Sequence, residues 1–138
     1  MTQWANSLIR ISGYEVETLQ KRLADIVTRR AQATMRLAVL DAEMEVEKTR
    51  AADDPQANML MPAYVEGWKI RRRATESEVD MLASEEDGAR DALARAFEEL
   101  KKFEHVAEVS RLGRARAEAK RETAALDELA LRRKKRAG

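Results

Sequence analysis

Acidic and basic side chains supply most of the reactive groups in this chain of 138 residues, with 25 Asp or Glu, 26 Lys or Arg and a formal net charge of +1. Carboxylates act as general acids or bases only where a pocket shifts their pKa. His105 is the single histidine and cysteine is absent, which excludes two-histidine and thiolate metal sites and cysteine nucleophiles. No glycine-rich phosphate loop is present. We expect no catalytic, metal-binding or cofactor-binding residue and no enzymatic activity. For His105, a solvated or half-packed side chain is weighed against a proton shuttle.

A run of basic residues lies near the end of the chain. From residue 111 onward there are ten basic and four acidic residues, a net charge of +6. Residues 62–110 carry eight basic and twelve acidic residues, a net charge of −4. Three interpretations of the run stay open: a docking end for an acidic protein surface, a solvated helix terminus, or a nucleic-acid contact. The absence of aromatic residues after Phe103 argues against the nucleic-acid contact. The run consists of Arg132, Arg133, Lys134, Lys135 and Arg136.

The most apolar patch of the chain runs from Met59 to Trp68 and includes Tyr64. Aromatic and methionine side chains are enriched at protein–protein interfaces. Trp68 either closes the end of a helical seam by packing against Met44, or belongs to a partner site at an exposed tip.

Helices must position these groups, because few aromatics, five Gly, two Pro and 37% charged residues are typical of long helices and coiled coils. Apolar residues alternate at spacings of three and four through the first 52 residues, the pattern of a coiled-coil seam. Arg30 interrupts this seam, as do Ser12 and Glu47. The first helix is expected over about 4–52, beginning near Gln3 or restarting at Ser12, where Gly13 favours a break. The seam residues are Ile9, Val16, Leu19, Leu23, Ile26, Ala33, Leu37, Leu40 and Met44.

A turn is expected over residues 53–61, which contain Asp53, Asp54 and Pro55. Proline disfavours helical geometry in the preceding residue, and Asp bonds readily to nearby backbone. Pro62 then suits the first turn of a second helix, expected over about 62–136. Its seam residues are Val65, Trp68, Thr75, Val79, Leu82, Ala89, Leu93, Ala96, Leu100 and Phe103.

Folding the second helix back on the first gives one consistent register, in which the numbers of paired seam residues sum to 112. The two polar intruders then fall in adjacent layers, Arg30 opposite Leu82 and Glu86 opposite Ile26. A bond between Arg30 and Glu86 would fix the register, as polar seam residues do at some cost in stability.

Surface charges fit the same register. It places Arg29 near Glu85, and Arg36 near Glu76 and Glu78. It also places an acidic run opposite a basic one. These runs are Asp41, Glu43, Glu45 and Glu47, and Lys69, Arg71, Arg72 and Arg73. The charge pattern and the turn both disfavour the rival fold, a parallel dimer of single helices.

The predicted fold is all-α: one domain over residues 1–138, an antiparallel two-helix coiled-coil hairpin with a C-terminal helical overhang. Roughly 25 residues of the second helix project beyond the first, on the order of 37 Å. No apolar run approaches the ~20 residues that span a bilayer, and no secretory signal is recognisable. A cytoplasmic location is therefore expected.

Residues at both ends of the sequence resemble the flagellar export protein FliJ family. The stretch Leu8-Ile9-Arg10-Ile11, followed by Leu19-Gln20-Lys21-Arg22-Leu23, is similar to the start of the family's sequences. The stretch Glu118-Ala119-Lys120-Arg121-Glu122, with the basic end, is similar to their C-terminal part. The resemblance implies a non-enzymatic stalk of the flagellar type III export apparatus. The implied partners are the hexameric export ATPase, FliI, and the export-gate protein, FlhA.

By position in the hairpin, the resemblance implies that the end with both termini enters the ATPase ring. The gate-facing candidates in the turn-proximal half are Leu40, Met44, Tyr64 and Trp68. The protein is then expected at the cytoplasmic face of the inner membrane, reaching the membrane only through its partners and binding no nucleic acid. Two alternatives remain: an architectural coiled coil that self-associates, and a basic helix that binds nucleic acid.

Overall fold

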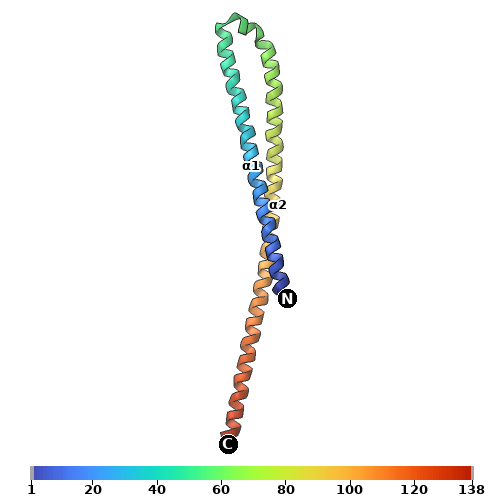
Figure 1. The fold of residues 1–138 in the computed structure, drawn as a ribbon, viewed down its shortest axis with the longest axis vertical. Helices are drawn as coiled ribbons and strands as arrows, with labels where there is room; N and C mark the ends of the chain where they lie inside the picture. The colour runs from blue at the N-terminus through green and yellow to red at the C-terminus, as the bar shows by residue number, and fades with distance from the viewer. Residues whose placement is uncertain (1, 138) are drawn as a thin grey trace. The chain divides into compact units, whose positions relative to one another are not determined.

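The computed structural model describes residues 2–137, and all of them except Asp54 are helical. Helix α1 spans Thr2–Asp53 and helix α2 spans Pro55–Ala137 (Figure 1). No strand occurs between residues 2 and 137, so the predicted all-α helical hairpin is confirmed. Neither helix, over the described residues, is long and apolar enough to cross a membrane.

Two compact units divide the chain, and each pairs a piece of α1 with a piece of α2. The turn unit comprises residues 17–94, and the terminal unit comprises residues 1–16 and 95–138. Each unit is described below by itself. The expectation of a single domain stays a prediction.

Asp54 alone forms the break between the helices. Its backbone N–H donates to the Arg50 carbonyl at 3.1 Å, which completes the last turn of α1. Its side chain then caps α2, because Oδ1 accepts the Gln56 N–H at 3.0 Å and the carbonyl accepts the Asn58 N–H at 3.0 Å. Pro55 occupies the first position of α2, where its missing N–H removes no helical bond.

The expected turn over residues 53–61 is therefore too long, and the second helix begins at Pro55 rather than near Pro62. Pro62 lies inside α2 and cannot donate to the Asn58 carbonyl. The first helix begins at Thr2, next to the expected Gln3, and runs through Gly13 without a break, with Ser12 buried in the seam.

In the turn unit the seam follows the predicted heptad positions. Ile26 is 1% exposed, Ala33 is 0% exposed and Leu82 is 2% exposed. Met44 and Ala89 are buried as well. Most other positions of the unit are exposed, so the core is a single narrow seam along each helix.

In the terminal unit the first turns of α1 pack on the part of α2 that begins at residue 95. Ala5, Ser12, Val16 and Ala96 are buried. From residue 111 to residue 137 every residue is exposed, although α2 remains helical throughout (Figure 1). Within this unit, the unpaired length of α2 corresponds to the predicted overhang.

Candidate partner-binding surfaces

Ion pairs between the helices of the turn unit form a regular ladder along one edge of the seam. Arg29 Nη2 donates to Glu85 Oε2 at 3.5 Å, and Arg36 Nη2 donates to Glu78 Oε2 at 2.7 Å. The two rungs are seven residues apart on each helix, as a heptad register requires. Both bonds join residues that the sequence places near each other, whereas the predicted neighbour Glu76 bonds Arg72 instead.

A third rung is expected one heptad nearer the turn, between Glu43 and Arg71. The charges are complementary, yet within residues 2–137 neither side chain has an ion pair or side-chain hydrogen bond. We call this the open rung.

The structure brings together the two polar seam residues that the sequence singles out. Arg30 Nη1 donates to Glu86 Oε2 at 3.2 Å, and Arg90 Nε lies 3.5 Å from the same oxygen. The Glu86 side chain is 11% exposed and that of Arg30 is 43% exposed. The carboxylate is thus buried with a partner from each helix. Its role in fixing the register stays a prediction.

Trp68 ties α2 to α1 near the turn. Its indole Nε1–H donates to the Leu40 carbonyl at 2.6 Å, and the Arg72 guanidinium carbon lies 5.7 Å from its ring centroid. Met44 is 5% exposed, whereas Leu40, Tyr64 and Trp68 are half-buried. Trp68 is therefore bonded to α1, and both of its interpretations, closing the seam against Met44 and belonging to a partner site, stay predictions. In this conformation Met44 belongs to the hairpin core.

A bidentate ion pair lies beside Trp68 on the same side of the turn unit. Arg72 Nε and Nη2 donate to the two carboxylate oxygens of Asp41 at 2.8 and 3.3 Å, and Arg72 also pairs with Glu76. Hydrogen bonding from Arg72 holds the pKa of the Asp41 carboxyl below its ordinary value, and the same bond raises the pKa of Arg72. Of the predicted acidic and basic runs, this is the facing pair that the structure connects.

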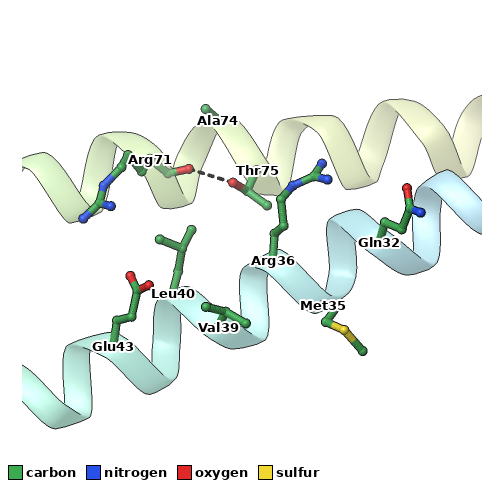
Figure 2. Close-up of a pocket in the computed structure, with 9 residues that line it drawn as sticks. All are labelled: Gln32, Met35, Arg36, Val39, Leu40, Glu43, Arg71, Ala74 and Thr75. Carbon is green, nitrogen blue, oxygen red and sulfur yellow. Dashed lines mark hydrogen bonds between the residues drawn. The ribbon is translucent and has the colours of Figure 1, made fainter.

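A groove of about 650 Å³ opens between α1 and α2 beside the open rung. Leu40 points from α1 toward α2 (Figure 2), and Val39 and Ala74 are also among the residues that line the groove. Glu43 and Arg71 both line it, and Figure 2 draws no bond between them. The groove is therefore apolar in its middle and charged at its margin.

Sequence reasoning overlooked a second pattern of uncharged residues, of which Met35, Val39 and Ala74 also line this groove. On each helix of the turn unit a stripe of exposed, uncharged residues repeats at spacings of four, three and four, on the side away from the seam. Four residues of the two stripes are large and exposed: Met35 at 69%, Val39 at 50%, Ile70 at 67% and Met81 at 56%. The same search for heptad spacing that found the seam would have found these outer stripes. They comprise Met35, Val39, Ala42 and Val46 on α1, and Ile70, Ala74, Ser77 and Met81 on α2.

The basic end lies in the terminal unit, on the unpaired part of α2. Arg132 Nη2 donates to Glu128 Oε1 at 3.0 Å within the helix. Over the described residues, Arg133, Lys134, Lys135 and Arg136 have no ion pair. Their charges are free for a partner, and they also suit the negative end of the helix dipole. All three interpretations, a docking end, a solvated terminus and a nucleic-acid contact, thus remain.

No group of three or more His, Cys, Asp or Glu residues within residues 2–137 is arranged to hold a metal ion. His105 is exposed on α2. The absence of catalytic residues and cofactors stays a prediction.

Comparison with known proteins gives two curated relatives, each named "Flagellar FliJ protein". They come from Caulobacter vibrioides strains NA1000 / CB15N and ATCC 19089 / CIP 103742 / CB 15. Each is 53% identical over 133 residues, covering 96% of this chain and 96% of the relative. The chain belongs to the flagellar FliJ family.

Identity at this level over nearly the whole chain makes the FliJ family assignment independent of the weak heptad motifs that first suggested it. No profile of a known protein family matches the chain, and no solved structure matches it significantly. The predicted family is confirmed.

Proposed function

We propose that this protein is a non-enzymatic stalk of the flagellar type III export apparatus, linking the hexameric export ATPase to the export-gate protein and promoting export. The observation that carries the proposal is the 53% identity to proteins named for the flagellum over 96% of the chain. The protein is then located at the cytoplasmic face of the inner membrane and reaches the membrane through these partners alone.

The terminal unit is the proposed ATPase-binding part. Its helical residues 111–137 are all exposed and end in the unpaired cations Arg133 to Arg136. A helix without a packing partner is marginal in water, because most helical stability in proteins comes from tertiary contacts. An ATPase ring with an acidic lining would supply both the contacts and the opposite charge.

The turn unit is the proposed gate-binding part. Of the candidate tip residues, Leu40, Tyr64 and Trp68 are partly accessible, and the outer stripes add exposed apolar side chains on the outer side of each helix. Exposed apolar patches of this kind are typical of protein–protein interaction sites.

ATP hydrolysis by the cognate export ATPase tests the proposal. The intact chain, added below one copy per hexamer, is expected to stimulate turnover. A variant ending at residue 131 lacks the basic end and is expected to stimulate less, while an Arg29→Gln variant keeps that end and serves as the control. Absence of stimulation by the intact chain, together with absence of binding to either export component, would contradict the proposal.

A further inference from the structure

The ion-pair ladder of the turn unit is closed at two rungs and unpaired at the third. Arg29 pairs with Glu85, and Arg36 pairs with Glu78. At the open rung, one heptad nearer the turn, neither charged side chain has an ion pair within residues 2–137. Exposed ion pairs add little stability in any case, so these two charges can matter more through the registers that they oppose.

The apolar seam by itself does not exclude a register shifted by one heptad. Such a slip moves α2 along α1 by seven residues, about 10 Å at 1.5 Å per residue. Every seam position then faces another seam position, because the pattern repeats every seven residues. The turn moves by half of that, about three or four residues, and helix ends fray at small cost. The bond between Arg30 and Glu86 breaks in either direction and opposes both slips alike.

Opposite charges of the ladder also meet in the slipped registers, because ladder positions recur every seven residues on each helix. If α2 moves away from the turn, Arg22 faces Glu85 and Arg29 faces Glu78. That register contains two attractive contacts, as does the observed one. If α2 moves toward the turn, Arg36 faces Glu85. Attraction along the ladder therefore does not distinguish the observed register from its neighbours.

Like charges meet in both slipped registers, and the residues of the open rung supply them. Movement of α2 away from the turn brings Arg71 opposite Arg36. Movement toward the turn brings Glu43 opposite Glu78, and it brings Arg71 opposite Arg50. Facing charges of the same sign are destabilising and select among registers of a coiled coil. In the observed register neither charge of the open rung faces its own sign.

We propose that Glu43 and Arg71 set the register of the turn unit by electrostatic repulsion. Arg71 opposes a slip of α2 away from the turn, and Glu43 opposes a slip toward it. Both residues act by destabilising other registers, so they need no partner in the observed one. The proposal concerns the two helices of one unit and does not depend on the proposed function.

The distance between two spin labels, measured by pulsed electron paramagnetic resonance, reports a slip and its direction. The chain has no cysteine, so Gln32→Cys on α1 and Glu66→Cys on α2 give two selective attachment sites. Both residues are exposed, and Glu66 lies nearer the turn than Gln32 does. Movement of α2 away from the turn shortens their separation along the helices by about 10 Å, and movement toward the turn lengthens it equally.

Three charge reversals are made in the labelled chain. Arg71→Glu is expected to give a second population with the shorter separation, because the new carboxylate attracts Arg36 in the slipped register and repels Glu43 in the observed one. Arg36→Glu changes the same contact from α1 and should give the same shorter population. Glu78→Arg should instead give a longer separation, because the new cation attracts Glu43 when α2 moves toward the turn.

Arg73→Glu is the matched control. It makes the same change of charge on α2, at a position off the ladder that has no ion pair over the described residues. The control should keep the single distance of the labelled chain. The second populations of the other variants should shrink in about 1 M salt, which screens exposed charges. Circular dichroism shows whether each variant remains helical.

A single unchanged distance at low salt in either Arg71→Glu or Arg36→Glu would overturn the proposal, and if one variant loses its helices the other still decides. A shorter separation in Glu78→Arg would contradict the assigned directions. A shift in Arg73→Glu would also overturn the proposal, since net charge would then be the cause. So would second populations that persist unchanged at high salt.

Discussion

At the scale of single residues, the turn unit is held together by a few polar contacts that each join the two helices. The Asp41–Arg72 pair is bidentate, and Trp68 next to it donates to a backbone carbonyl of α1. Because the core is a single narrow seam, such contacts orient the helices as well as stabilising them. Exposed pairs contribute little stability singly, so their value lies in geometry.

The Asp41–Arg72 pair makes the hairpin sensitive to acid. The folded state lowers the pKa of Asp41 below its ordinary value of 3.8, which applies in the unfolded chain. The stabilisation that the ion pair gives is therefore fully present above the unfolded pKa. The contribution is lost as the pH falls through the lower folded pKa. Asp41→Asn should therefore lower the melting temperature slightly at pH 7, and the difference should vanish in stronger acid.

The matched control is Glu43→Gln, which removes a carboxylate on the same helix that bonds nothing within residues 2–137. Its melting temperature should equal that of the unaltered chain at both pH values. A difference between Asp41→Asn and the unaltered chain that persists in strong acid would show that the ion pair is not its cause.

At the scale of secondary structure elements, the two prolines have opposite consequences because of where they lie. Pro55 is the first residue of α2, preceded by the cap residue Asp54, whereas Pro62 lies in the helix interior. Interior proline removes a backbone hydrogen bond and clashes with the carbonyl four residues earlier. The turn is accordingly defined by Asp54 and Pro55, and Pro62 is a defect that the helix tolerates.

Pro62→Ala should raise the free energy of unfolding by up to about 3 kcal/mol, because it restores the bond to the Asn58 carbonyl. Pro55→Ala should give no such gain, since the first helical position has no bond to restore. Urea unfolding followed by circular dichroism measures both. A larger gain for Pro55→Ala than for Pro62→Ala would contradict the assigned helix start.

Heptad spacing predicted much of this fold from the sequence. Apolar residues at alternating spacings of three and four predicted the seam and the antiparallel pairing, because a two-helix core has few other ways to bury apolar residues. The same register predicted the bond between Arg30 and Glu86. The length of the turn was overestimated, since capping by the Asp54 side chain is a local geometry that composition does not reveal. The open rung was unpredictable for a similar reason. Complementary charges indicate a pair, and only coordinates show that Glu43 and Arg71 have no ion pair within residues 2–137.

At the scale of the whole molecule, the near-neutral net charge of +1 conceals a strong asymmetry. Residues 111–138 carry a net charge of +6, ten basic against four acidic residues, while residues 62–110 carry −4, eight against twelve. Charge of one sign attracts partners of the other and speeds their encounter. The exposed basic residues 111–137 and the net acidic residues 62–110 therefore attract partners of opposite charge.

Bridging of the two proposed partners tests the central claim most directly. The cognate export ATPase is immobilised as a hexamer, and the amount of export-gate protein retained is measured with and without this chain. The gate protein is expected to be retained only when the intact chain is present, and a variant ending at residue 131 should retain less. Equal retention without the chain, or no retention with it, would contradict the account.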